Sequence, residues 1–168
     1  HNRPTSRGFV RASSGDILNA PKIQFNYLQT ETDKQGFRDA LRLTREIMNQ
    51  PAMDAYREEV ISPRDDVISD EQIDDFVASA VDSAYHPCGT CRMGNGDLAV
   101  VDAELRVRGI ANLRVVDASV FPSIPNGNLN APTMMLAERA ADLIKGRQML
   151  EPFDAPYYTD PQWQTRQR

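Results

Sequence analysis

His86 is the side chain of this 168-residue sequence that is best suited to proton transfer. It is one of two histidines, and it lies away from the terminus in the loop-rich run HPCGTCRMGNGD at residues 86–97. A neutral imidazole in such a loop could act as a general base near neutral pH. Spacing alone nevertheless favours a simpler interpretation, in which His86 caps the preceding helix or hydrogen-bonds a carbonyl.

Two cysteines follow His86, and Cys88 and Cys91 form a CxxC motif. A single close pair argues against a disulfide framework and indicates a reducing compartment. Redox CxxC motifs usually follow a strand and open a helix, whereas this motif lies between HP and RMG. A zinc site would need two further ligands, and the histidines available are His1 and His86. The sequence therefore favours two small buried thiols in a tight loop and predicts no metal.

Three amides, at Asn126, Asn128 and Asn130, precede a predicted helix in the run PSIPNGNLN. Asparagine favours turns and helix N-caps, so at least one of them is expected to be structural. The start of a helix also presents unpaired N–H groups and a partial positive charge, which suit an anion or a group that becomes negative during a reaction. A predicted strand that ends in Asp117 resembles the nucleotide-contacting edge of an α/β sheet.

The elements that must position these residues begin with two predicted strands, over 8–12 and 22–28, around a Ser–Ser–Gly–Asp turn. Period-two alternation places Ile23, Phe25 and Tyr27 on one face of the second strand. Apolar residues then recur at three- and four-residue steps from 37 to 48, which predicts an amphipathic helix. Pro51 stops this helix and predicts the start of another, which would carry Met53, Ala55 and Tyr56.

A further helix is expected to begin at Ser69, because Ser69 and Gln72 have capping-box spacing. Acidic residues in its first turns suit the positive end of the helix dipole. This acidic cluster could be a docking patch, but a solvated helix start is the favoured interpretation. The predicted buried face consists of Ile73, Phe76, Val77, Ala80 and Val81.

The pattern changes near residue 85, after which short β-type runs at 100–101, 105–107 and 113–116 lead to a helix. This helix is expected to start at Ala131 and to close at Gly146. Residues 147–168 show no periodicity and are expected to form an irregular tail. The elements together predict an α+β fold.

Composition and charge narrow the class of protein. The chain has 19 Lys+Arg against 24 Asp+Glu, a net charge of −5, which argues against a nucleic-acid partner. With 40% hydrophobic and 26% charged residues it is expected to be soluble and globular. No apolar run approaches the roughly 18 residues that a membrane span needs.

Three stretches carry a resemblance to a known family: HPCGTCRMG at 86–94, PNGNLNAPTMM at 125–135 and FRDALRLTREIMNQPA at 37–52. Over roughly residues 7–146 the sequence resembles the C-terminal part of the glucose–methanol–choline oxidoreductases, and within them the branch that acts on choline. The resemblance implies an FAD-dependent enzyme that oxidises a small alcohol, with choline as the expected substrate, and passes a hydride to flavin N5.

The resemblance also implies roles for individual residues. His86 matches the catalytic histidine, and Asn128 matches a second catalytic position that holds His or Asn in different members. The implied FAD-binding positions are Asp117, Ala118, Asn130 and Thr133.

One family feature, the GxGxxG that opens the FAD-binding fold, is not found in this sequence. We therefore expect a C-terminal portion that works with a missing N-terminal FAD-binding portion. Residues 1–84 would belong to the substrate-binding domain, 85–146 to the C-terminal part of the FAD-binding domain, and 147–168 to the tail. Further expectations are an electron acceptor that is either oxygen or an electron-transport carrier, a homodimer, and a cytoplasmic location, free or peripheral to the inner membrane. The alternative is a non-catalytic fragment that serves as a binding or oligomerisation module.

Overall fold

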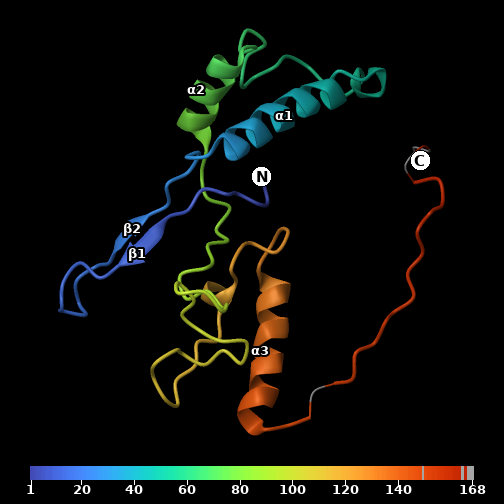
Figure 1. Cartoon of the computed structure of the whole chain (residues 1–168). Coiled ribbons are helices and arrows are strands. Elements are labelled where there is room, and N and C mark those ends of the chain that lie inside the picture. The colour runs from blue at the N-terminus through green and yellow to red at the C-terminus, as the bar shows by residue number, and fades with distance from the viewer. Residues whose placement is uncertain (149, 164, 166–168) are drawn as a thin grey trace.

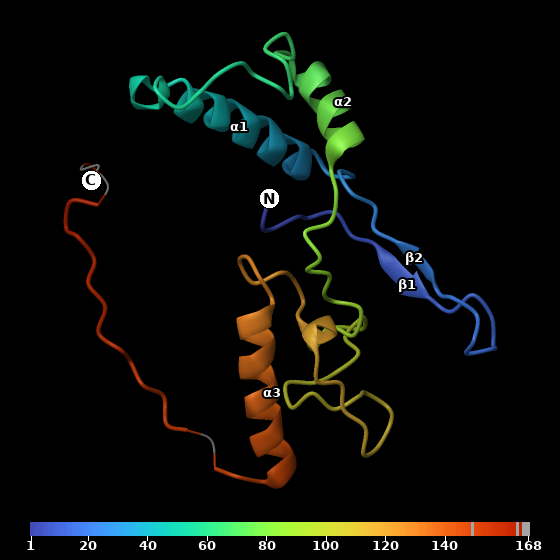
Figure 2. The ribbon, with the colours of Figure 1, turned by 180° about the vertical axis from the view of Figure 1, so that it is seen from behind.

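The computed structural model describes residues 1–148, 150–163 and 165. Figures 1 and 2 show an elongated arrangement, with two helices at one end, a third at the other and a hairpin projecting from the side. In chain order the elements are β1 (Phe9–Arg11), β2 (Lys22–Gln24), α1 (Glu31–Met48), the 3-10 turn η1 (Pro51–Met53), α2 (Asp70–Ala80), the 3-10 turn η2 (Ala118–Val120) and α3 (Asn130–Lys145). Helices with a small sheet confirm the predicted α+β class.

The first two strands form an antiparallel hairpin, as predicted, although each is shorter than its sequence pattern. β2 ends at Gln24 because the chain then enters left-handed backbone, with φ of 56° at Asn26 and 58° at Leu28. Gly8 lets the two sides of the hairpin approach closely, since a Cβ added at Gly8 would lie 2.0 Å from the Gln24 carbonyl oxygen. The strand residues are exposed on both faces of the hairpin.

Helix α1 begins earlier than its apolar stripe, which starts at Phe37. Thr30 acts as the N-cap, and its Oγ1 accepts a hydrogen bond from the Asp33 N–H at 3.3 Å. Carboxylates at Glu31 and Asp33 then lie in the first turn, where the helix dipole favours negative charge.

Asp33 ties the N-terminal segment to α1. Its side chain is 2% exposed. Oδ1 accepts hydrogen bonds from the Thr5 N–H at 2.7 Å and the Thr5 hydroxyl at 2.9 Å, and Oδ2 accepts one from the Ser6 N–H at 2.9 Å. Burial alone would raise the pKa of this carboxyl, but hydrogen bonds from Ser6 and Thr5 outweigh burial and lower the pKa to about 2. The segment that leads into β1 is thereby held on the first turn of α1.

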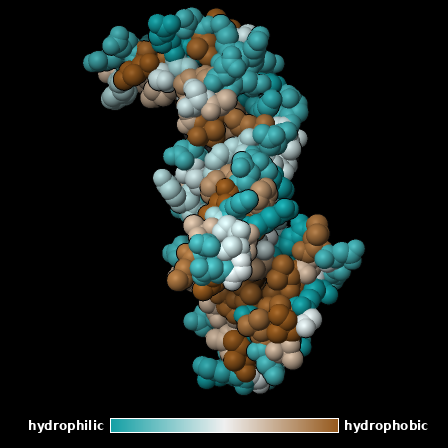
Figure 3. Space-filling view, turned by 90° about the vertical axis from the view of Figure 1, so that its left-hand side faces the viewer, coloured by the Kyte–Doolittle hydropathy of each residue, from teal (hydrophilic) through white to brown (hydrophobic). Residues whose placement is uncertain are grey.

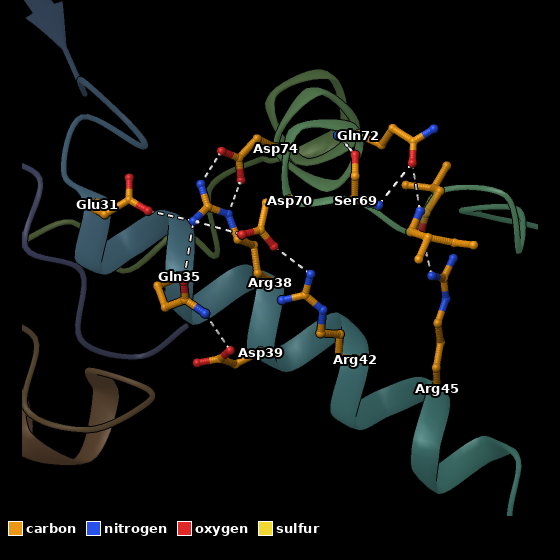
Figure 4. Close-up of polar contacts among 12 residues, drawn as sticks. Glu31, Gln35, Arg38, Asp39, Arg42, Arg45, Ser69, Asp70, Gln72 and Asp74 are labelled. Carbon is orange, nitrogen blue, oxygen red and sulfur yellow. Dashed lines mark hydrogen bonds and ion pairs between the residues drawn. The ribbon is translucent and has the colours of Figure 1, made fainter.

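Arg38 joins α1 to α2 (Figure 4). Its buried guanidinium donates to both carboxylate oxygens of Asp74, from Nε at 2.7 Å and from Nη2 at 2.5 Å. This bond from Arg38 lowers the pKa of the Asp74 carboxyl. Arg42 donates to Asp70 at 2.5 Å. The acidic start of α2 is therefore not simply solvated, because the carboxylates of Asp70 and Asp74 accept hydrogen bonds from arginines of α1.

Two helix-boundary predictions are confirmed. At the start of α2, Ser69 Oγ accepts a hydrogen bond from the Gln72 N–H at 3.1 Å, and Gln72 Oε1 accepts one from the Ser69 N–H at 3.0 Å. At the end of α3, Gly146 is left-handed with φ of 63°, and its N–H donates to the Leu143 carbonyl at 3.3 Å.

The helix predicted after Pro51 is wrong. The chain makes only the single turn η1, and Ala55 and Tyr56 lie outside it. Arg57 folds this segment back, since its Nη1 donates to the Met48 carbonyl at the end of α1 at 2.8 Å.

The predicted apolar face of α2 is only partly buried. Ile73 and Val77 are buried, Phe76 and Val81 are half-buried, and Ala80 is exposed. The cause is that α1 covers one side of α2, so the outer positions of the stripe stay in solvent.

A buried apolar cluster surrounds α3 and does not include the buried residues of α1 and α2. We call it the second core. Its buried members come from α3 and from the segments that precede it: Val101, Leu105, Val120, Phe121, Leu129, Leu136 and Ala140. The predicted β-type runs here form isolated bridges between Met93, Val101 and Val107 and between Arg106 and Arg114, not strands. Left-handed backbone at Leu105 and Asn112 turns the chain before a run reaches strand length. Among the described residues, no helix combines the length and apolar character needed to cross a bilayer.

We predict that Asp33→Asn lowers the free energy of unfolding at neutral pH by about 2 kcal/mol, because the folded pKa lies below its ordinary value of 3.8. The carboxylate contributes fully above that ordinary value, and its contribution is lost as the pH falls through 3.8 toward 2. Urea unfolding at pH 7 and pH 3 measures both effects. The exposed Asp65→Asn serves as control, and an equal loss in both variants would contradict the role of Asp33.

Candidate active site

His86 lies in the coil between α2 and the second core, and its side chain is half-buried. The residue before it, Tyr85, is left-handed with φ of 59°. A hydrogen bond of 3.0 Å from the Tyr85 N–H to Ser83 Oγ supports this turn. The predicted helix-capping role of His86 is wrong, because α2 ends at Ala80 with Val81 as its C-cap.

The loop after His86 is paired with the segment that leads toward α3. The Cys91 N–H donates to the Ser119 carbonyl at 3.0 Å, and the Met93 N–H donates to the Val120 carbonyl at 2.8 Å. Two residues before Cys91, Gly89 has φ of 89°, and an added Cβ would lie 3.3 Å from the Phe121 carbonyl oxygen. This position requires glycine for both its conformation and its close approach.

Asp117 and Ala118 lie at the corner where this pairing meets η2. Asp117 is the N-cap of η2, and its Oδ1 accepts a hydrogen bond from the Ser119 N–H at 2.8 Å. The side chain of Asp117 is exposed, and Ala118 is half-buried. Asp117 therefore has a local structural role that leaves its second carboxylate oxygen available to a ligand.

The remaining predicted site residues gather at the N-terminus of α3. Asn130 and Thr133 are in its first turn, and Asn128 lies in the preceding loop. Of the two structural roles expected for an asparagine here, a turn or an N-cap, the N-cap is not taken, because Leu129 occupies that position and no side chain caps the helix. Asn128 and Asn130 are exposed, and Thr133 is half-buried. The first N–H groups of α3 are thus available to an outside acceptor.

A shared core brings the His86 and Asn128 segments onto one support. Cys88, two residues after His86, packs against the buried cluster that contains Leu129, the neighbour of Asn128. The backbone pairing of residues 91–93 with 119–120 reinforces this arrangement.

An open hollow that is lined by the chain neighbours of His86, though not by His86 itself, was missed at the level of sequence. It measures about 460 Å³ and is lined by Phe25, Tyr27, Asp82, Ser83, Tyr85 and Pro87. Tyr85 and Pro87 flank His86 in the chain, whereas the rings of Phe25 and Tyr27 come from the hairpin and stack at 5.1 Å. The sequence did place Phe25 and Tyr27 on one face of a strand, but it did not indicate that this face lies against residues 82–87 and forms a hollow with them.

The CxxC cysteines are free thiols, and both are half-buried. Burial raises the pKa of the Cys88 thiol, which disfavours the reactive thiolate. Across residues 1–148, 150–163 and 165, no three His, Cys, Asp or Glu side chains are grouped so as to hold a metal ion.

Comparison with known proteins assigns the family. The model of the GMC oxidoreductase C-terminal domain matches residues 4–137. The chain belongs to the GMC oxidoreductase family.

Members of the GMC oxidoreductase family with curated names extend this result. The chain is 58% identical over 169 residues to an "Oxygen-dependent choline dehydrogenase" of Vibrio vulnificus (strain YJ016), covering 99% of this chain and 30% of that protein. It is 58% identical over 156 residues to the protein of the same name from Chromohalobacter salexigens, covering 93% of this chain and 28% of that protein. The chain thus spans about 30% of the length of the curated relatives that it matches.

Solved structures of GMC-type enzymes have the same fold. Pyridoxine 4-oxidase from Mesorbium loti matches with a TM-score of 0.82 and 39% identity over 88% of this chain and 29% of that chain. An FAD-dependent oxidoreductase from Chaetomium thermophilum matches with a TM-score of 0.83 and 34% identity over 87% of this chain and 26% of that chain.

We predict that Gly89→Ala destabilises the protein by about 1–3 kcal/mol, because alanine must adopt left-handed backbone next to the Phe121 carbonyl. Gly96→Ala is the control, since nothing lies within 4 Å of a Cβ added at that position. Thermal unfolding compares the two variants. Equal melting temperatures would show that the close approach at Gly89 does not constrain the loop.

Proposed function

We propose that this chain is the C-terminal part of an FAD-dependent oxidoreductase that oxidises choline to betaine aldehyde. The observation that carries the proposal is the hollow lined by the chain neighbours of His86, where three aromatic residues and Asp82 come together. The 58% identity to a protein named a choline dehydrogenase supports the same substrate.

The hollow has the chemistry that a quaternary ammonium group requires. A trimethylammonium cation cannot donate a conventional N–H hydrogen bond, so aromatic faces and a nearby carboxylate are the groups that attract it. Phe25, Tyr27 and Tyr85 offer the aromatic surface, and Asp82 offers the negative charge.

His86 and Asn128 are the proposed catalytic pair. The imidazole of His86 takes the proton from the substrate hydroxyl, and the Asn128 amide N–H donates a hydrogen bond to the substrate oxygen. Removing that proton favours departure of hydride from the neighbouring carbon, because the oxygen electrons form the carbonyl. The product is the aldehyde, and two electrons leave with the hydride.

The residues present fit FAD, the cofactor that the family implies. Helix α3 has no side-chain cap, so its first N–H groups and its dipole suit an electron-rich oxygen of the flavin ring. Asn130 and Thr133 lie in that first turn, and Asp117 and Ala118 would hold the remainder of the cofactor. FAD, when bound, supplies the hydride acceptor at flavin N5.

The proposal requires a preceding FAD-binding portion as partner, which the 30% coverage of the relatives supports. The name of those relatives, "Oxygen-dependent", favours molecular oxygen over a respiratory carrier as electron acceptor. We further propose a homodimer and a cytoplasmic location, free or peripheral to the inner membrane. The free cysteines support that location, because disulfides are rare in reducing compartments.

We predict that His86→Ala in the full-length protein lowers turnover of choline by about 10²–10⁴-fold, the range for loss of a positioned acid–base group. The flavin absorbance band should remain, since His86 is not among the residues proposed to hold FAD. Steady-state kinetics and the absorbance spectrum test both parts. Near-normal turnover in a flavin-loaded variant would refute the role of His86.

We predict that Tyr85→Ala lowers kcat/KM for choline by about 2- to 30-fold, from the loss of a cation–π contact. The uncharged isostere 3,3-dimethylbutan-1-ol should be affected much less, because it has the same shape without the cation. Asp82→Asn should show the same selectivity, and Tyr56→Ala, an exposed tyrosine outside the hollow, is the control. Equal losses for both alcohols would mean that the hollow does not bind the cation.

A further inference from the structure

The segment after α3, residues 150–163, exposes an unusual number of large apolar side chains. Their exposed fractions are 92% for Leu150, 85% for Phe153 and Tyr157, 80% for Tyr158 and 64% for Trp163. Burying such side chains removes apolar surface from water and so stabilises the packed state. An isolated apolar residue at a surface needs no explanation, but a run of them in one segment marks an interaction site.

The segment is built to remain extended. It contains neither helix nor strand, and Pro152, Pro156 and Pro161 disfavour both. Figures 1 and 2 show it leaving the end of α3 and running back toward the end of the molecule that carries α1. Extended, proline-containing peptides are a recurrent form of docking segment.

The charge of the segment indicates the surface that it fits. Glu151, Asp154 and Asp160 are its charged residues, and residues 150–163 contain neither Lys nor Arg. A complementary surface would therefore be apolar with basic side chains along its rim.

Helix α3, from which the segment departs, also has an uncovered apolar face. Met134, Ala137 and Ile144 are exposed and, with the half-buried Ala141, follow one another at steps of three and four residues, to one side of the buried Leu136. Met134 and Ile144 are each 58% exposed. Figure 3, seen from the left-hand side of Figure 1, shows further apolar surface over the lower half of the molecule, which holds α3 and the loops before it.

We infer that residues 150–163 form a strap that closes over the preceding, FAD-binding portion of the full-length protein, which is seated against the exposed face of α3. This inference rests on the proposed function for the identity of that portion. The chain spans only about 30% of its curated relatives, which leaves a large body to cover both apolar surfaces. The Vibrio vulnificus relative aligns with 99% of this chain, so a full-length protein retains a counterpart of the strap.

Hydrogen exchange measured by mass spectrometry on the full-length protein tests the strap. In the wild-type protein, amides in residues 150–163 should exchange at least ten times more slowly than the random-coil rate. Phe153→Ser combined with Tyr157→Ser should return them to that rate, while Tyr56→Ser, an equally exposed tyrosine elsewhere, should not. Random-coil exchange in the wild-type protein would overturn the inference.

Two further arms separate the alternatives. The first arm dilutes the protein and follows its oligomeric state by light scattering. If a dimer dissociates on dilution and the protection of residues 150–163 is lost with it, the strap lies on a second copy and the inference is overturned. Choline turnover is measured on the same samples. A protected strap without choline oxidation refutes only the proposed function, and choline oxidation with an unprotected strap refutes only the strap.

Discussion

The backbone pairing of residues 91–93 with residues 119–120 is the constraint on which the candidate site depends. It consists of two hydrogen bonds, from the Cys91 and Met93 N–H groups to the Ser119 and Val120 carbonyls. These bonds lie between the loop that follows His86 and the turn that follows Asp117. Because the same turn is followed by the loop that enters α3, the proposed base, the proposed amide donor and the residues proposed to bind FAD share one support.

Gly89 makes this pairing possible, because its backbone is left-handed and lies against the Phe121 carbonyl. The HPCGTCRMG motif therefore combines two demands. His86 is the proposed base, and the residues after it hold the loop on the second core. The thiols of the motif help to hold the loop, since Cys88 packs against the buried cluster and burial raises the pKa of its thiol.

The α1–α2 end of the molecule is held by charge more than by apolar burial. Arg38 bonds both oxygens of Asp74, and Asp33 accepts the backbone of Thr5 and Ser6. A buried charge is tolerated only when it is paired or hydrogen-bonded, and both of these groups are. These bonds also help to position the hollow, because the hairpin that carries Phe25 and Tyr27 leads into the first turn of α1, which Asp33 anchors.

The sequence by itself determined the family, the α+β class and the ends of two helices. Caps such as Ser69 with Gln72, and Gly146, depend on residues within a few positions of one another, so local pattern suffices to predict them. Arg38 and Asp74 could not be paired in this way, and Pro51 suggested a helix where the chain makes a single turn and Arg57 bonds back to the Met48 carbonyl. Only the tertiary structure brought Phe25 and Tyr27 against Asp82 and Tyr85. Contacts between residues so far apart in the chain follow from how the hairpin and the 82–87 coil pack, and no local spacing encodes that packing.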